Sequence, residues 1–218
     1  MSEMSVDEYG LMRKRMVEEQ IAARGIHDPR VLAGMRSVFR HCFVPSDDLA
    51  WAYSDGPLPI GYGQTISQPY IVALMTELLE LEPTDRVLEV GGGCGYQAAV
   101  LGELAGEVHA VEIIPELAQQ AEKTLADLGY THVRFHAGDG SSGWPKAAPY
   151  NGILVAAAAP KVPQPLLDQL AADGRLVIPV GSRSMQQLEV WKRIGDKFNH
   201  QVILEVCFVL LRGKFGWN

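Results

Sequence analysis

Residues 86–101 read RVLEVGGGCGYQAAVL, in which a short apolar segment, a turn with four glycines and a second apolar segment follow one another. The first segment has the composition of a buried strand, and the second has the apolar spacing of a helix. Glycine adopts positive φ without strain and lets the backbone approach a ligand closely. A helix that begins at such a turn also presents unpaired N–H groups. The stretch therefore predicts a strand, a cofactor-binding turn and a helix.

The same alternation of strand and helix continues along the chain from residue 69. Strands are expected at residues 86–90, 107–113, 132–139, 152–159 and 175–181, and helices at 69–81, 96–104, 115–129 and 163–174. After Gly181 the helical patterns stop, and residues 187–211 indicate two or three strands joined by a Gly-Asp turn, which favours an antiparallel edge. This order predicts an α/β fold with a mostly parallel, doubly wound, Rossmann-like sheet that carries helices on both faces.

Residues 1–68 precede this alternation and contain two helical patterns and a turn-rich stretch. Helical spacing covers residues 6–24 and ends at Gly25, and a short helix over 29–36 begins at Pro29 behind Asp28 as a possible cap. The Pro, Gly and Asp residues of 43–68 favour loops and a short hairpin. We expect one domain over 1–218, in which 1–68 forms a cap with substrate-side loops and 69–218 forms the Rossmann-like core.

The composition is that of a globular enzyme or binding domain, with 47% hydrophobic and 21% charged residues. The formal net charge of −7 disfavours nucleic acid and anionic membranes as partners. Three widely spaced cysteines, and six histidines without an HxH or HxxxH pattern, predict neither a disulfide framework nor a metal site. The N-terminus lacks the apolar region of a signal peptide, and no stretch has the length of a membrane span. We expect a soluble, cytoplasmic protein.

The spacing of the glycines distinguishes between two classes of cofactor. A dinucleotide fingerprint requires G-x-G-x-x-G, but the sixth position counted from Gly91 is Tyr96. The chain instead has E-x-G-x-G-x-G from Glu89 to Gly95, which resembles motif I of the S-adenosylmethionine-dependent methyltransferases. In that family the turn passes around the methionine moiety, whose ammonium group needs acceptors. An acidic Glu89 suits this cation better than it suits a pyrophosphate.

Two further acids follow the next two strands. Glu112 closes the second strand, where both nucleotide-binding families place a carboxylate that accepts from ribose hydroxyls. Asp139 follows the third strand, where methyltransferases bind the adenine amino group. One acid at a strand end often only caps a helix. Three in order, at the carboxyl ends of successive strands, favour a methyltransferase.

Residues 138–153, GDGSSGWPKAAPYNGI, resemble position for position the signature of the protein-L-isoaspartate (D-aspartate) O-methyltransferases. The resemblance covers nearly the whole chain, including AYSDGPLPIGYGQTISQPYIVALMTELL and CFVLLRG. Two positions depart from the family. Cys94 stands where a small hydroxyl residue is usual, which favours a small residue in a tight turn over a redox role. Leu210 stands where proline is usual, which can alter an edge strand.

The resemblance implies an enzyme that transfers a methyl group from S-adenosyl-L-methionine to the free α-carboxylate of L-isoaspartyl residues in damaged proteins, and it leaves activity on D-aspartyl residues open. The products are S-adenosyl-L-homocysteine and a methyl ester that collapses to a succinimide. Ser67 is the implied active-site serine, with Gln64, Thr65 and Ile66 on the substrate side. The implied cofactor residues are Glu89, Gly91, Gly92, Gly93, Gly95, Glu112, Asp139 and Gly140, with Gln186 as a further contact. The family uses no metal and mostly acts as a monomer.

Residues 61–70, GYGQTISQPY, are polar and carry no charge, which suits this chemistry. A carboxylate is ionised near neutral pH, so no general base is needed. The methyl donor is a sulfonium cation, so excluding water and aligning the reacting atoms should supply most of the acceleration. Neutral donors orient a carboxylate without reducing its reactivity, whereas an arginine would stabilise the ground state and slow attack. Ser67 can act as such a donor, and it can equally be the N-cap of a helix that begins at Gln68-Pro69. Both roles stay open.

Three other functions are weighed against this one. An amino-group methyltransferase of nucleic acids is expected to carry Asn/Asp-Pro-Pro-aromatic after the fourth strand, where this chain has AAAAPKVP. An aspartyl O-methyltransferase of the same fold, acting on a specific peptide, is expected to carry an additional C-terminal module. A non-catalytic cofactor-binding scaffold is disfavoured by the complete set of acids and by Ser67. Assay of paired Asp and isoAsp peptides separates these possibilities.

Overall fold

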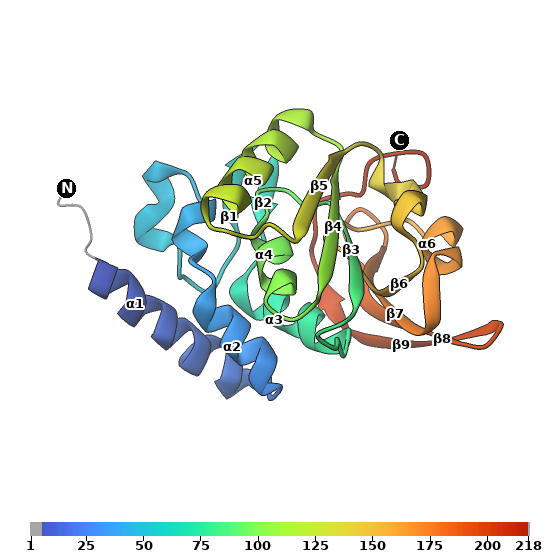
Figure 1. The fold of residues 1–218 in the computed structure, drawn as a ribbon, viewed down its shortest axis with the longest axis horizontal. Helices are drawn as coiled ribbons and strands as arrows, with labels where there is room; N and C mark the ends of the chain where they lie inside the picture. Colours follow the sequence, from blue (N-terminus) through green and yellow to red (C-terminus); the bar gives the residue numbers. More distant parts are fainter. Residues whose placement is uncertain (1–5, 218) are drawn as a thin grey trace.

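A seven-stranded sheet forms the centre of the computed structural model, which describes residues 6–217 (Figure 1). The strands lie in the order β5-β4-β3-β6-β7-β8-β9, with bounds β3 (Arg86–Val90), β4 (Glu107–Glu112), β5 (Val133–Ala137), β6 (Tyr150–Val155), β7 (Leu170–Gly181), β8 (Gln186–Ile194) and β9 (Lys197–Val206). Strands β3 to β7 pair in parallel, whereas β8 and β9 are antiparallel. The predicted fold class is confirmed. Because the strand order turns back between β3 and β6, the ligand-binding switch point lies at the carboxyl end of β3.

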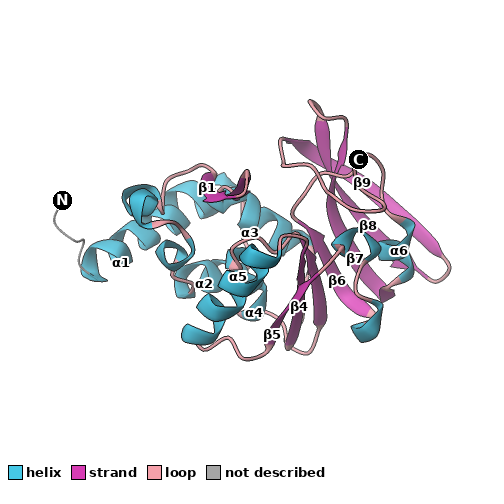
Figure 2. Cartoon of the chain, turned by 90° about the horizontal axis from the view of Figure 1, so that it is seen from above, coloured by secondary structure: helices cyan, strands magenta, loops and turns pink. Residues whose placement is uncertain are grey.

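Helices cover both faces of this sheet (Figure 2). The first face carries α3 (Pro69–Leu78), α4 (Tyr96–Gly102) and α5 (Pro115–Asp127), and the second carries α6 (Gln164–Asp168). The alternation of side chains along β3 supplies both apolar layers. Val87 packs in a cluster with residues of α3 and α4, whereas Leu88 and Val90 pack with residues of α6. Two short 3-10 turns, Gly140–Ser142 and Pro145–Ala147, precede β6.

The predicted helix over residues 163–174 is wrong in its second half. α6 ends at Asp168, and β7 begins at Leu170, which pairs with Tyr150 of β6. The following residues pass an irregularity in this ladder, where Asp173 has a φ of 59° and a Cβ on Gly174 would lie 2.9 Å from the carbonyl oxygen of Tyr150. Leu170 to Asp173 include good helix formers, but pairing with a buried strand outweighs local propensity.

The two predicted N-terminal helices are present. α1 (Val6–Arg15) continues through a π-helical segment, Met16–Ile21, and a 3-10 turn, Ala22–Arg24, to Gly25 with a φ of 95°. α2 (Pro29–Ser37) begins behind Asp28, whose Oδ1 accepts a hydrogen bond from the Arg30 N–H at 2.8 Å. The predicted cap is therefore confirmed.

The turn-rich stretch that follows contains the predicted hairpin. Two 3-10 turns, Arg40–Phe43 and Ser46–Trp51, lead to β1 (Leu58–Gly61) and β2 (Gln64–Ile66), which pair antiparallel. Buried residues of this N-terminal part, among them Met16 and Ile21, belong to the same apolar cluster as α3 and α4. Ile66 of β2 belongs to this cluster as well, so the hairpin packs beside the helices that flank the switch point.

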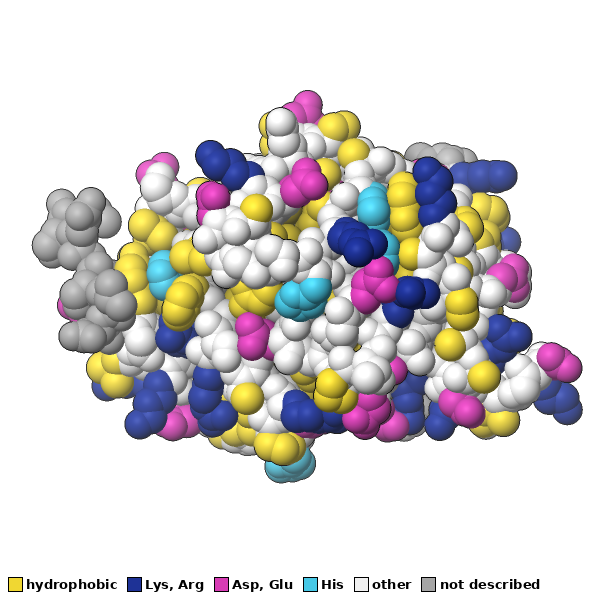
Figure 3. Space-filling model, in the orientation of Figure 1, with side chains coloured by type: hydrophobic (Ala, Val, Ile, Leu, Met, Phe, Trp, Pro, Cys, Tyr) yellow, Lys and Arg dark blue, Asp and Glu magenta, His cyan; other side chains and the backbone are white. Residues whose placement is uncertain are grey.

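The surface carries mixed charges. Figure 3 shows basic and acidic side chains interspersed over the face in view. Among the helices of residues 6–217, none is both long enough and apolar enough to cross a membrane. Within the same range, no group of three or more His, Cys, Asp or Glu side chains is placed to hold a metal ion.

Candidate active site

The glycine-rich turn lies between β3 and α4, at the switch point of the sheet. Gly91, Gly93 and Gly95 have φ values of 84°, 53° and 91°, which are strained for residues that carry a Cβ. At Gly92 the limit is space, because an added Cβ would lie 2.6 Å from Cζ of Phe135. Desolvation within the turn raises the pKa of the Cys94 thiol to about 11, so it stays neutral. Backbone conformation therefore explains the glycines, and a small neutral residue suffices at position 94.

A cavity opens at the carboxyl ends of β3, β4 and β6. It brings together most of the residues that the sequence singled out, namely Gln64, Thr65, Ile66, Ser67, Glu89, Gly91, Gly92, Gly93, Glu112 and Gly140. Three others do not line it. Gly95 lies behind the turn against α5, where a Cβ would be 3.2 Å from that of Ala121. Asp139 and Gln186 have other contacts, which are described below.

Glu89 is the most unusual acid of the cavity. Its side chain is 1% exposed, and neither carboxylate oxygen has a hydrogen-bond partner among the residues that the structure describes. Burial, and then the negative charge of Glu112, raise the pKa of Glu89 well above 4.5. A buried, unpaired carboxylate costs free energy unless a donor or cation meets it. Glu89 is therefore arranged to receive a cationic or hydrogen-bond-donating group.

Glu112 connects the glycine turn to the loop after β4. Its Oε2 accepts from the Gly93 N–H at 2.8 Å, and its Oε1 accepts from the Ile114 N–H at 2.9 Å. Each carboxylate oxygen can accept two hydrogen bonds, so each keeps capacity for one further donor. Two neighbouring hydroxyl groups are a suitable pair of donors.

Asp139 holds the C-terminal segment instead of facing the cavity. Its Oδ1 accepts from the N–H and the hydroxyl of Ser141 at 2.9 and 2.6 Å, and its Oδ2 accepts from the Lys214 N–H at 2.8 Å. Burial opposes ionisation, but the hydrogen bonds from Lys214 and Ser141 outweigh it and lower the pKa of Asp139. Its neighbour Gly140 does line the cavity. The adenine contact of Asp139 stays a prediction, and its bracing role was not predicted.

Gln186 is engaged with the backbone at the end of β9. Its Oε1 accepts from the Phe208 N–H at 2.6 Å, and its Nε2 donates to the Phe208 carbonyl at 3.2 Å. The side chain is 2% exposed, and it lines no part of the cavity. These bonds occupy both ends of the amide. The structure therefore places Gln186 as a support for residue 208, and its predicted contact with the cofactor has no counterpart in this geometry.

Ser67 lies just before α3 with its hydroxyl uncommitted. The N-cap position of α3 is Gln68, and no side chain caps this helix. Ser67 Oγ forms no hydrogen bond with any residue of the described range 6–217. An N-cap serine would accept from a backbone N–H of the first turn. The cap interpretation is therefore wrong, and the hydroxyl is available to a ligand.

A second groove meets the cavity at Ser67. We call it the α3 groove, and it is lined by Arg24, Gln68, Tyr70, Ile71 and residues 204–208. Four residues line both spaces, namely Thr65, Ser67, Ala156 and Val209, and we call them the reaction junction. None of the four carries a charge. A ligand in the α3 groove and a ligand in the cavity would therefore be in contact at residues that carry no charge and that include the free hydroxyl of Ser67.

Some lining residues were missed by the sequence analysis. Ala156 directly follows β6, so its place at a strand end could have indicated it. Val209 and Arg212 come from the C-terminal segment, which returns across the sheet edge through hydrogen bonds between Ala158 and the backbone of Val209 and Leu211. No local pattern predicts such a return, because it depends on tertiary contacts.

The residues of the cavity fit S-adenosylmethionine, the cofactor that the sequence implies. The orphaned carboxylate of Glu89 provides two acceptors for an ammonium group. The remaining acceptor capacity of Glu112 suits the two ribose hydroxyls. Both features favour a ligand with a cation and a vicinal diol.

Replacing Glu89 with glutamine is expected to stabilise the ligand-free protein at pH 8, because the amide keeps the shape of the side chain and removes the charge that burial penalises, which costs about 1.4 kcal/mol for each unit by which the pKa is raised. Because the folded-state pKa is raised, the protonated form is the more stable one, and stability is lost as the pH rises through that pKa. The wild type and Glu89→Gln should therefore match near pH 4 and diverge toward pH 8. Urea unfolding at both pH values tests this.

The exposed Glu122 of α5 supplies the matched control, since Glu122→Gln removes a charge that is solvated in both states. It should change stability by less than about 0.5 kcal/mol at either pH. A Glu89→Gln variant that is less stable than the wild type at pH 8 would show that the carboxylate has a partner in the ligand-free protein, against this interpretation.

Comparison with known proteins gives consistent matches over the full chain. The family model described as Protein-L-isoaspartate(D-aspartate) O-methyltransferase (PCMT) matches residues 12–216. A protein-L-isoaspartate O-methyltransferase of Methanoregula boonei is 56% identical, over 94% of this chain and 95% of its own length. That of Methanoculleus marisnigri is 54% identical, over 99% and 98%.

Two solved structures agree in fold. A protein-L-isoaspartate O-methyltransferase has a TM-score of 0.86 at 29% identity, over 94% of this chain and 67% of that one. A Plasmodium falciparum structure in complex with S-adenosyl-L-homocysteine has a TM-score of 0.78 at 22% identity, over 94% and 98%. The second likeness concerns the fold alone.

Proposed function

The chain belongs to the protein-L-isoaspartate(D-aspartate) O-methyltransferase family, and we propose that its reaction junction is the place where the substrate carboxylate accepts the methyl group. The enzyme uses S-adenosylmethionine to methylate the free α-carboxylate of L-isoaspartyl residues in damaged proteins. S-adenosylhomocysteine is the second product, and the methyl ester collapses to a succinimide. The roles of individual residues in this reaction are our proposal.

The lack of charge at the reaction junction is the observation that carries this assignment. The junction holds the hydroxyls of Thr65 and Ser67 and the apolar side chains of Ala156 and Val209, with no base and no cation. A carboxylate is already ionised near neutral pH and needs no base. A neutral hydroxyl orients it, whereas a clamped arginine would stabilise the ground state and slow attack. Ser67 Oγ, which has no intramolecular partner, is the proposed donor.

The acids and the glycine turn of the same cavity would hold the cofactor. When bound, S-adenosylmethionine supplies a methyl group on a positively charged sulfur. Glu89 would bind its ammonium group, and Glu112, which braces the glycine turn through the Gly93 N–H, would bind the ribose. Gly140 lies beside Asp139 and lines the adenine end. Glu89 and Glu112 are 1% and 5% exposed, so the groups that they bind would be shielded from water, which strengthens these contacts.

Labelled S-adenosylmethionine and paired peptides that differ only in Asp or isoAsp test this function. We expect a base-labile methyl ester on the isoAsp peptide and at least about 100-fold less on the Asp peptide, because only isoAsp places its free carboxylate on the α-carbon. A D-aspartyl peptide forms the third arm.

Each of the other outcomes names a different function. Ester on the Asp peptide would identify an aspartyl-modifying enzyme. Cofactor binding without transfer to any peptide would identify a scaffold. Ser67→Ala protein serves as the control for ester formed outside the junction.

We also propose a cytoplasmic monomer that acts on proteins and peptides, and not on nucleic acids or membranes. The net charge of −7 disfavours nucleic acid. Cys42, Cys94 and Cys207 are free thiols, which is compatible with a reducing compartment. Residues 1–218 are proposed to form one domain, since the buried residues of the cap 1–68 share an apolar cluster with the core 69–218.

A further inference from the structure

Two grooves meet the cofactor cavity beside Val209, and one of them also shares Gln64, Leu210 and Arg212 with the cavity. The first is the α3 groove. The second, which we call the C-terminal groove, is lined by Gly63, Gln64, Arg183, Leu210, Arg212 and Trp217, and Val209 lines both grooves and the cavity. A peptide whose isoaspartyl carboxylate reaches the reaction junction therefore has one groove for each of its two flanks. This step rests on the proposed function.

The C-terminal groove is basic. Arg212 is exposed, and it forms no ion pair and no side-chain hydrogen bond with residues in the described range. The guanidinium of Arg183 lies over the ring of Trp217, 5.0 Å from its centroid. The Trp217 N–H donates to the Ala158 carbonyl at 3.0 Å, which fixes the ring. Among residues 6–217, no acidic side chain lines the groove.

Other acids of this region are directed elsewhere. Asp139 lies under the same segment, but its oxygens accept from Ser141 and from the Lys214 N–H. The α3 groove differs in charge, because Arg24 is paired with Asp55 at 3.1 Å and Glu205 is exposed on its lining. The two flanks of a bound peptide thus meet different electrostatic surroundings.

We propose that the C-terminal groove is a subsite for an acidic side chain that flanks the isoaspartyl residue, with Arg212 as its specificity-determining residue. A guanidinium matches the two oxygens of a carboxylate. Exposed ion pairs contribute little individually, so the preference is moderate. Going from an attracted carboxylate to a repelled ammonium group should change kcat/KM about tenfold.

An isoAsp peptide series tests this subsite. Glu, Gln or Lys is placed singly at each of three positions on either side of isoAsp, and kcat/KM is measured with saturating cofactor. We expect kcat/KM to decrease in the order Glu, Gln, Lys at positions on one side of isoAsp only. The difference between the three peptides should be smaller at high salt, because exposed charges are screened. Arg212→Gln should flatten this order, and Arg212→Glu should reverse it at the same positions.

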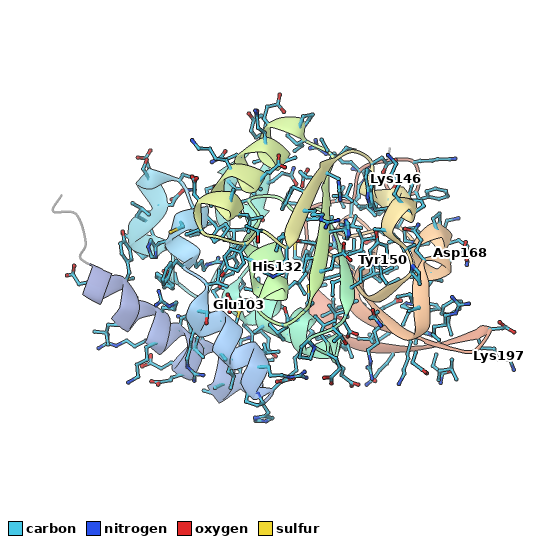
Figure 4. All side chains as sticks on the ribbon, in the orientation of Figure 1. Glu103, His132, Lys146, Tyr150, Asp168 and Lys197 are labelled. Atoms are coloured by element: carbon cyan, nitrogen blue, oxygen red, sulfur yellow. The ribbon has the colours of Figure 1, made fainter. Side chains whose placement is uncertain are left out.

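For each enzyme variant, the quantity compared is the ratio of kcat/KM for the Glu peptide to kcat/KM for the Lys peptide. A change in cofactor binding affects both values and cancels in this ratio. Lys197→Glu provides the matched charge reversal at the far tip of the β8–β9 hairpin (Figure 4), and it should keep the wild-type order. The proposed subsite is contradicted if the Arg212→Glu variant still prefers the Glu peptide. It is also contradicted if this preference is reversed in the Lys197→Glu variant. No ester on the neutral isoAsp peptide with the wild type would instead overturn the proposed function.

Discussion

Replacing Glu112 with glutamine is expected to weaken binding of S-adenosylmethionine about 100-fold and to leave kcat at saturating cofactor within about threefold of the wild type. Both oxygens of Glu112 accept a backbone N–H, from Gly93 at 2.8 Å and from Ile114 at 2.9 Å. A glutamine has only one oxygen, so its NH₂ group must face one of these donors. The variant loses a charged acceptor for the ribose and one support of the glycine turn.

The magnitude follows from the energies of such hydrogen bonds. A hydrogen bond to a charged group contributes about 1.5–3 kcal/mol, and about 2.7 kcal/mol corresponds to 100-fold in affinity. Glu112 is not part of the reaction junction, so the transfer step itself should be nearly unaffected once cofactor is bound. Calorimetric titration gives the dissociation constant, and initial rates give kcat.

Glu116→Gln is the matched control, because it is the same substitution at an exposed position in the first turn of α5. It should bind cofactor as the wild type does. If Glu112→Gln bound within threefold of the wild type, Glu112 would be only a brace between two loops and the ribose contact would be wrong.

The sequence predicted the switch point well because its signals are local. A strand, a turn of glycines and a helix follow one another within residues 86–101, and positive φ at Gly91, Gly93 and Gly95 explains why glycine is needed there. Glu89 and Glu112 were found because parallel strands bring their carboxyl ends to one edge. The positions of these glycines and acids depend mainly on the neighbouring strand and turn, and little on distant parts of the chain.

The failures arise where tertiary contacts override local preference. Residues 170–173 have helical propensity, yet Leu170 pairs with Tyr150 in the sheet. The amide of Gln186 holds the backbone of Phe208, a role that was not predicted, and its contact with the cofactor stays a prediction. Arg212 gave no signal, because its place beside the cavity depends on the return of the C-terminal segment.

The role of Ser67 shows how the structure separates two interpretations that the sequence left equal. A serine before Gln68-Pro69 fits a helix cap, but the N-cap of α3 is Gln68 and no side-chain cap bond is formed. Ser67 instead lines both the cofactor cavity and the α3 groove. Its hydroxyl thus forms no helix cap and is placed where the cavity and the α3 groove meet.

Ser67→Ala is therefore expected to lower kcat by up to about 100-fold, the loss that follows when a reacting group is misplaced by about 1 Å. Stability should change by less than about 0.5 kcal/mol, because no cap bond is lost. The affinity for S-adenosylmethionine should stay within about threefold, since the change removes a donor to the substrate carboxylate. Single-turnover rates, urea unfolding and cofactor titration measure the three quantities.

Ser67→Thr distinguishes loss of the hydroxyl from loss of shape at this position. It keeps the donor and adds a methyl group to a half-buried site, so it should recover at least part of the lost rate, whereas Ser67→Ala should not. A Ser67→Ala variant with full turnover and a stability loss of about 1 kcal/mol would restore the cap interpretation. Full turnover with unchanged stability would assign orientation of the carboxylate to Thr65, the other hydroxyl of the reaction junction.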